Sequence, residues 1–309
     1  MDILIKGRYI DLRVDSLLSE VLKEKALTRS IIQKHIKNGC KVNGKECKKS
    51  YRLKEGDTLY IDEAYWDSVK QDLDLSKDIL SQKGDLDIRY EDDDLIVLYK
   101  PKDLVVHPGV GNNDNTLANH VRYYLESKGE YDSLLDRAGI VHRIDKGVSG
   151  LMFVAKRKSV QEYLKGEFSK KRVIKIYHAY LEESNKLEQE IDLKEYLKKM
   201  NINLLPWKSW EKVEGYIGRD RVNRYRMEFR TYEFSGSKYA LSYILFSGNQ
   251  ALIKIDTGRM HQIRATLKYL GYHIKGDKLY GNGVGDSIML ESVLLSFTKQ
   301  DGERLTLSI

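Results

Sequence analysis

Residues 139–151 read GIVHRIDKGVSGL, and they place the ionisable side chains of His142, Arg143 and Asp145 just before the apolar run LMFVAK. Three glycines and a serine allow this segment a tight, irregular backbone, which is the kind of loop that projects side chains into a cleft. Taken alone, the segment is also compatible with a surface loop that contains an Arg143–Asp145 ion pair. Its meaning therefore depends on the sequence around it.

The flanking sequence predicts an α+β body. Residues 223–256 alternate between apolar and polar side chains, which indicates meandering antiparallel strands. No regular βαβ repeat occurs, so we expect a mixed, mostly antiparallel sheet with flanking helices and loops. Strand-like runs lie at 94–100, 150–156 and 173–182, and helical periodicity lies at 115–127, 159–168 and 261–271.

The N-terminal residues predict a second, smaller α+β domain, which we assign to 1–62. Thr28 is placed to cap a helix that carries the basic residues Arg29, Lys34 and Lys37 and ends at Gly39. Short strands are expected at 40–42, 45–47 and 59–61, with a turn between the first two.

Charge separates this domain from the body. Residues 1–62 hold 14 Lys/Arg against 9 Asp/Glu, whereas 63–100 hold 5 against 11. We therefore predict an acidic linker over 63–86, with room for one short helix, followed by a large domain over 87–309. A basic helix beside a basic hairpin is suited to RNA phosphates.

Composition excludes several protein classes. Hydrophobic residues make up 41% of the 309 residues and charged residues 32%, so wholesale disorder is excluded. No apolar run reaches the roughly 18–20 residues of a membrane span, and early charges argue against a signal peptide. Cys40 and Cys47 are too few for a disulfide framework. We expect a soluble, cytoplasmic monomer, and the net charge of +7 mildly favours a polyanionic partner.

Four separated motifs resemble the RluA-type pseudouridine synthases. Residues 142–150 are similar to that family's H-R-L-D-x-x-T-S-G-L signature. Residues 90–109 resemble its first motif, 175–179 its K-x-Y-x-A segment, and 257–281 its C-terminal T-G-R-x-H-Q-I-R and G-D-x-x-Y-G motifs. The small domain is similar to an S4 RNA-binding domain, and this combination resembles the branch that modifies large-subunit (23S) ribosomal RNA. The large domain is then a pseudouridine synthase domain.

The resemblance implies a reaction and three catalytic residues. The N1–C1′ bond of a uridine is broken, the uracil rotates, and a C5–C1′ bond forms. Asp145 matches the family's carboxylate, which attacks C1′ or assists removal of the C2′ proton. Arg264 matches the arginine that keeps this carboxylate ionised, and Tyr177 matches the aromatic residue that holds the detached base.

The same resemblance implies an RNA interface without a metal or cofactor. The uridine must leave its stack before Asp145 can reach it. Arg143 matches the residue that fills the vacated space, and His142 is expected to support it or to contact phosphate. Arg259 is a further candidate for phosphate binding, together with the basic helix of the small domain.

The chain departs from the family pattern at several positions. Ile144 replaces a leucine, Gly147-Val148 replaces a polar residue and a threonine, and Met260 replaces a threonine. Residues 187–222 match none of the motifs and are a candidate substrate-specific loop.

Three other interpretations stay open at this point. The chain could be a non-catalytic RNA-binding or ribosome-assembly factor, or a synthase that acts on transfer RNA. It could also be a glycoside hydrolase, which would need a second carboxylate about 5 Å from Asp145.

Overall fold

The computed structural model divides the chain into two compact units, Met1–Asp78 and Ile79–Ile309, and the two are treated separately below. The division lies inside the segment 63–86 that we predicted as a linker. The structure describes residues 1–25, 27–76, 79–109, 111–182, 191–281 and 287–309.

The first unit packs helices against a three-stranded sheet of order β1-β3-β2. The Thr28 side chain accepts a hydrogen bond from the Ile31 amide, as expected of a helix cap, and the helix ends at Gly39. The strand predicted at 45–47 is wrong. The chain makes only an isolated bridge from Val42 to Lys45, because β2 pairs with β3 instead. The elements are β1 Asp2–Leu4, α1 Val14–Val21, α2 Arg29–Gly39, β2 Cys40–Val42, β3 Thr58–Ile61 and α3 Glu63–Ser76.

Helix α3 occupies the first half of the predicted linker and belongs to the first unit. Trp66 is fully buried and its indole N–H donates to the Gly39 carbonyl at 2.8 Å. A Cβ atom at position 39 would lie 2.4 Å from this ring, so only glycine fits there. Trp66 thus anchors α3, together with the buried Val69 and the half-buried Tyr65 of the same apolar cluster.

The second unit is built on a ten-stranded sheet, with the path β4-β5-β6-β12-β7-β11-β10-β8-β9 and β13 beside β12. Among the described strands, β6 and β12 form the one parallel pair, so the sheet is mostly antiparallel, as predicted. The strands are β4 Asp87–Glu91, β5 Leu95–Lys100, β6 Ser149–Ala155, β7 Ile174–Tyr180, β8 Glu211–Arg219, β9 Met227–Arg230, β10 Lys238–Ser247, β11 Gln250–Ile255, β12 Leu290–Thr298 and β13 Arg304–Ser308.

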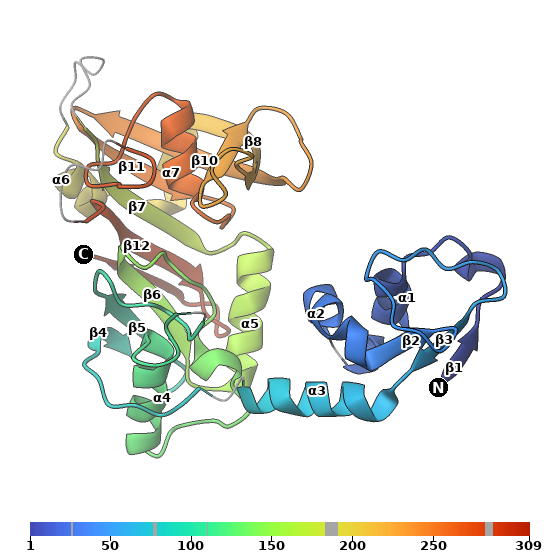
Figure 1. Ribbon diagram of the computed structural model, residues 1–309. Helices are drawn as coiled ribbons and strands as arrows, with labels where there is room; N and C mark the ends of the chain where they lie inside the picture. The colour runs from blue at the N-terminus through green and yellow to red at the C-terminus, as the bar shows by residue number, and fades with distance from the viewer. Residues whose placement is uncertain (26, 77–78, 110, 183–190, 282–286) are drawn as a thin grey trace. The chain divides into compact units, whose positions relative to one another are not determined.

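Helices cover both faces of this sheet, α4 and α7 on one face and α5 and α6 on the other. Figure 1 shows α4 at the β4–β5 end and α7 at the β8–β11 end, with β7 and β12 between them. Both helices contribute to the largest apolar cluster, which also contains Tyr177. No helix among the described residues is long and apolar enough to cross a bilayer. The helices are α4 Leu117–Ser127, α5 Lys158–Ser169, α6 Leu193–Lys199 and α7 Gln262–Tyr269.

The candidate substrate-specific loop at 187–222 has a structural role over its described part. Residues 187–190 lie outside the described residues. Trp207 and Trp210 follow α6 and are buried against Ile174 and Ile176. Since side chains alternate along a strand, this cluster lies on the face of β7 opposite to Tyr177.

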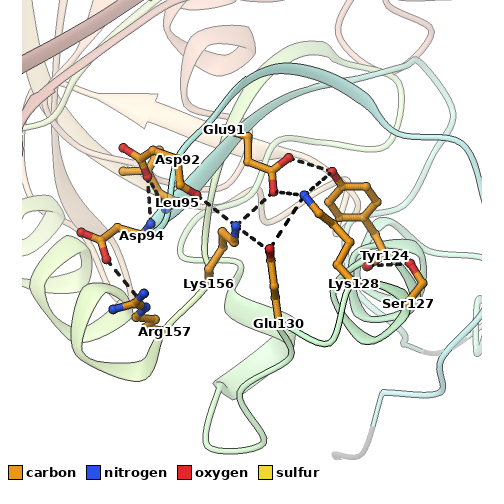
Figure 2. Close-up of polar contacts among 10 residues, drawn as sticks. All are labelled: Glu91, Asp92, Asp94, Leu95, Tyr124, Ser127, Lys128, Glu130, Lys156 and Arg157. Carbon is orange, nitrogen blue, oxygen red and sulfur yellow. Dashed lines mark hydrogen bonds and ion pairs between the residues drawn. The ribbon is translucent and has the colours of Figure 1, made fainter.

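A network of ion pairs joins β4 to the chain after α4 (Figure 2). Glu91 accepts hydrogen bonds from Tyr124 at 2.7 Å and from Lys128 at 2.8 Å. The mostly buried Lys156 donates to Glu91 at 3.1 Å and pairs with Glu130 at 2.5 Å. Burial by itself would raise the pKa of Glu91, but these donors outweigh it and lower the pKa to about 2.

We expect Glu91→Gln to lower the free energy of unfolding by about 1–3 kcal/mol at pH 7. The folded-state pKa of Glu91 is depressed, so its contribution is present above pH 4.5 and is lost as the pH falls toward 2. Urea unfolding at several pH values measures this. The variant and the wild type should converge in acid, and a difference that persists at pH 2 would contradict the assignment. Asp94→Asn, on an exposed carboxylate of the same surface, is the control.

Candidate active site

A cleft of about 910 Å³ lies in the second unit, and the segment 141–148 forms one of its walls. The β7 residues Lys175 and Tyr177, called its floor below, and residues 255–264 also line it. The cleft brings together six of the predicted site residues, which come from three distant parts of the sequence: His142, Arg143, Asp145, Tyr177, Arg259 and Arg264.

The loop that carries Asp145 is held by two special contacts. Gly150 has a left-handed φ of 122°, and a Cβ there would lie 2.4 Å from the Ser292 backbone, so glycine is required where β6 meets β12. The fully buried Lys100 donates to the carbonyls of Pro101, Leu104 and Lys146 at 2.7, 2.8 and 3.1 Å. The last of these bonds ties β5 to the loop one residue after Asp145.

We expect Lys100→Met to lower the turnover number about 100-fold, because it releases the loop without removing any group from the cleft. Lys100 is thus a positioning residue. The Michaelis constant for RNA should change much less than the turnover number, which steady-state kinetics would show. Lys102→Met, two residues away on the exposed surface, should behave as the wild type. An unchanged turnover number in Lys100→Met would contradict this role.

Asp145 faces Arg264, but the arginine is bound more closely elsewhere. Arg264 Nη1 lies 3.7 Å from Asp145 Oδ2. The same guanidinium makes two hydrogen bonds with the fully buried Asp277, at 2.7 and 2.6 Å. The amides of Leu279 and Tyr280 also donate to Asp277. Burial favours the neutral acid, but these partners together lower the pKa of Asp277 below its ordinary value.

Two further residues complete this side of the cleft. The His261 Nε2 atom lies 3.9 Å from Asp145 Oδ2, and its Nδ1 atom is 3.0 Å from the hydroxyl of Tyr280. Burial lowers the pKa of His261, so the ring is neutral at pH 7. The Arg264 guanidinium stacks 4.8 Å from the Tyr280 ring centroid. We did not predict roles for these residues or for Asp277, although the T-G-R-x-H and G-D-x-x-Y-G motifs contain all three.

Tyr177 is mostly buried and lines the cleft from the middle of β7. Its burial, and secondarily the charge of Asp145, raise the pKa of its phenol, so the ring stays neutral at pH 7. A neutral aromatic side chain in the floor of a cleft is suited to hold a flat base.

The side chains predicted to contact RNA differ in whether they are already engaged by other groups of the protein. Arg143 is exposed at the cleft, whereas the Nε of Arg259 donates to the Tyr239 carbonyl at 2.8 Å. His142 packs 5.0 Å from the Phe168 ring and accepts a hydrogen bond from the Phe153 amide at 2.9 Å. Its burial lowers the pKa to about 3, so His142 is neutral and supports the loop rather than supplying charge to a phosphate.

Of the three basic residues predicted on α2, two are exposed without a described ion pair and the third forms an ion pair. Lys34 and Lys37 are exposed on α2. Arg29 is 2.9 Å from the fully buried carboxylate of Asp15, which Arg13 also contacts at 2.9 Å. Arg29 therefore neutralises a buried charge while half of its side chain stays accessible.

The comparisons with known proteins identify the kind of enzyme that carries such a cleft. The family model of RNA pseudouridylate synthases matches residues 94–269. Ribosomal large subunit pseudouridine synthase D of Xylella fastidiosa is 32% identical over 297 residues, which cover 93% of this chain and 78% of that protein. The RNA pseudouridine synthase YlyB of Bacillus subtilis is 30% identical over 274 residues, 87% of this chain and 79% of that protein.

A solved structure shares the fold. The human RNA Pseudouridylate Synthase Domain Containing 1 protein covers 74% of this chain and 85% of its own, with a TM-score of 0.54 and 22% sequence identity. At this identity the likeness concerns the fold alone.

Proposed function

This chain belongs to the RNA pseudouridylate synthase family, and we propose that it isomerises uridines of large-subunit ribosomal RNA with Asp145 as the catalytic carboxylate. The enzyme class follows from the family, and the substrate and the residue roles are our proposal. The observation that supports it most is the accessible carboxylate of Asp145 in a cleft beside Arg264. The relatives that are named for the large ribosomal subunit support the choice of RNA.

The proposed chemistry depends on a carboxylate that stays ionised next to the ribose of the bound uridine. Arg264 provides positive charge 3.7 Å from Asp145, while Asp277 keeps the guanidinium in place. The neutral His261 adds a polar ring without a second charge. Asp145 then acts on the ribose at C1′ or C2′ as the N1–C1′ bond breaks.

The detached uracil must stay in the cleft while it turns and forms the C5–C1′ bond. Tyr177 lies in the floor of the cleft, where its ring can hold the base. Arg143 is exposed at the cleft and is the candidate for filling the space that the flipped nucleotide leaves in the RNA. Lys34 and Lys37 would contact phosphates through the first unit.

The glycoside hydrolase alternative lacks its second acid. Among the described cleft-lining residues, the other carboxylate is Asp256, and it forms an ion pair with Lys254. A general acid needs a carboxyl group that is free to act on the substrate, whereas Asp256 is engaged by Lys254.

The experiment that tests the substrate compares two unmodified transcripts, one of large-subunit ribosomal RNA and one mixture of transfer RNAs. Purified full-length protein should form pseudouridine in the ribosomal transcript at far higher kcat/KM. A preference for transfer RNA would contradict the proposed substrate, and RNA binding without pseudouridine would favour an assembly factor. Light scattering of the same preparation tests the monomer that we expect.

A further inference from the structure

One buried lysine of the cleft has no hydrogen-bond or ion-pair partner among the described residues. Four lysines are buried in the part of the chain that the structure describes. Lys100 donates to three carbonyls, and Lys156 contacts Glu91 and Glu130. Lys254 pairs with Asp256, whereas Lys175 is only 8% exposed and makes no hydrogen bond or ion pair with any described residue.

An unpaired buried ammonium is costly, so a protein that keeps one needs a reason. The described surroundings of Lys175 do not compensate for its burial. Its Nζ lies 5.4 Å from the Phe168 ring centroid. The carboxylate of Asp256 attracts Lys175 electrostatically but forms its ion pair with Lys254. Burial accordingly lowers the pKa of Lys175 to about 8, which still leaves it mostly charged at pH 7.

The position of Lys175 indicates what the missing partner is. Lys175 lines the cleft, and its Nζ reaches the loop at Gly258, where a Cβ atom would lie 3.9 Å away. It precedes Tyr177 by two residues on β7, so both side chains point to the same face, roughly 6.6 Å apart along the strand. This is about the separation of a base from the phosphates of its own strand.

A second lysine, Lys171, lines the same cleft as Lys175. Lys171 lines both the cleft and a neighbouring cavity of about 470 Å³. Its Nζ lies 5.6 Å from the Tyr239 ring centroid and has no carboxylate partner among the described residues. Arg172 and Arg304 line the neighbouring cavity as well. Arg172 is paired with Glu167 at 3.4 Å, so Lys171 is the cation that continues the positive charge of Lys175 along the cleft.

We propose that Lys175 binds a backbone phosphate of the RNA strand next to the uridine held at Tyr177, and that Lys171 binds the phosphate that follows. The inference rests on the proposed function in one respect, which is that RNA enters this cleft. The phosphate supplies the negative charge that Lys175 lacks in the protein, where no described carboxylate forms an ion pair with it. The lysine is therefore kept unpaired for the substrate at the expense of stability of the free protein.

The test uses Lys175→Met in the full-length chain and binding of a labelled single-stranded oligouridylate at several KCl concentrations. We expect affinity at low salt to fall about tenfold, and the slope of log K against log salt to fall by about 0.7, the value for one phosphate contact in single strands. Lys175→Arg should keep the slope. Lys199→Met, which removes an exposed lysine of α6, should change neither quantity.

A second readout separates a phosphate site from a structural lysine. Because Lys175→Met replaces an unpaired charge with an apolar side chain, the melting temperature should rise by about 2–4 °C. A lower melting temperature would show that the lysine stabilises the fold, and would overturn the proposal. Weaker binding with an unchanged salt slope would mean a neutral partner, and would also overturn it.

The result does not depend on turnover, since binding is measured without chemistry. If the wild type forms no pseudouridine but the slope and the melting temperature change as expected, the phosphate site stands and the proposed function fails. If pseudouridine forms and the slope is unchanged, the function stands and the phosphate site fails.

Discussion

Asp145→Asn is expected to lower the rate of pseudouridine formation about 10⁴-fold or more, because it removes the charge that acts on the ribose and keeps nearly the same shape. The side chain is partly accessible, and Arg264 is held in place by Asp277 without it. The fold and RNA binding should therefore be preserved. Single-turnover kinetics on saturating RNA measures the chemical step directly.

The matched control is Asp103→Asn, which makes the same carboxylate-to-amide change on a neighbouring loop. Asp103 is exposed and does not line the cleft. Its left-handed φ of 65° is one that asparagine tolerates. This control should retain wild-type activity. A similar rate in Asp145→Asn and in the control would show that Asp145 is not the catalytic carboxylate.

Arg264→Met is expected to lower the free energy of unfolding by about 3–5 kcal/mol, since it leaves the buried carboxylate of Asp277 without its cation. Pseudouridine formation should be lost as well, because Asp145 loses the nearby positive charge. The stability difference should shrink as the pH falls. In the wild type the pKa of Asp277 is depressed below 3.8, so its stabilising effect is present above that pH and is lost below it.

The double variant Arg264→Met/Asp277→Asn separates stability from catalysis. Removing both partners leaves no unpaired buried charge at this ion pair, so part of the lost stability should return. Activity should not return, because Asp145 still lacks its cation. Chemical denaturation and the activity assay are made on the same samples. Equal stability of the single and double variants would show that the Arg264–Asp277 ion pair is not what holds this region together.

Most elements of the fold could be predicted because their signals are local. The apolar run of β5 and the alternation of β10 and β11 specify strands, and the Thr28 cap specifies where α2 begins. Packing that depends on distant residues could not be predicted. Helix α3 is held by Trp66 against Gly39, 27 residues earlier in the chain, and nothing in its own periodicity shows this.

The sequence could predict which residues form the candidate site, but not which of them bond to one another. Motif resemblance selected Asp145, Tyr177 and Arg264, and the structure places all three in one cleft. The bond between Arg264 and Asp277 depends on how α7 packs beside the following loop, which no spacing rule specifies. The neutrality of His142 is likewise a consequence of its packing against Phe153 and Phe168, whereas its position in the motif left open whether it supports Arg143 or contacts phosphate.

The most direct test of the central claim is the mapping of pseudouridines in an unmodified large-subunit ribosomal RNA transcript after incubation with purified protein. The wild type should create pseudouridine at defined positions, and Asp145→Asn should leave those positions as uridine while still binding the transcript. Pseudouridine at the same positions with both proteins would contradict the role of Asp145 as the catalytic carboxylate, and pseudouridine with neither protein would contradict the proposed activity.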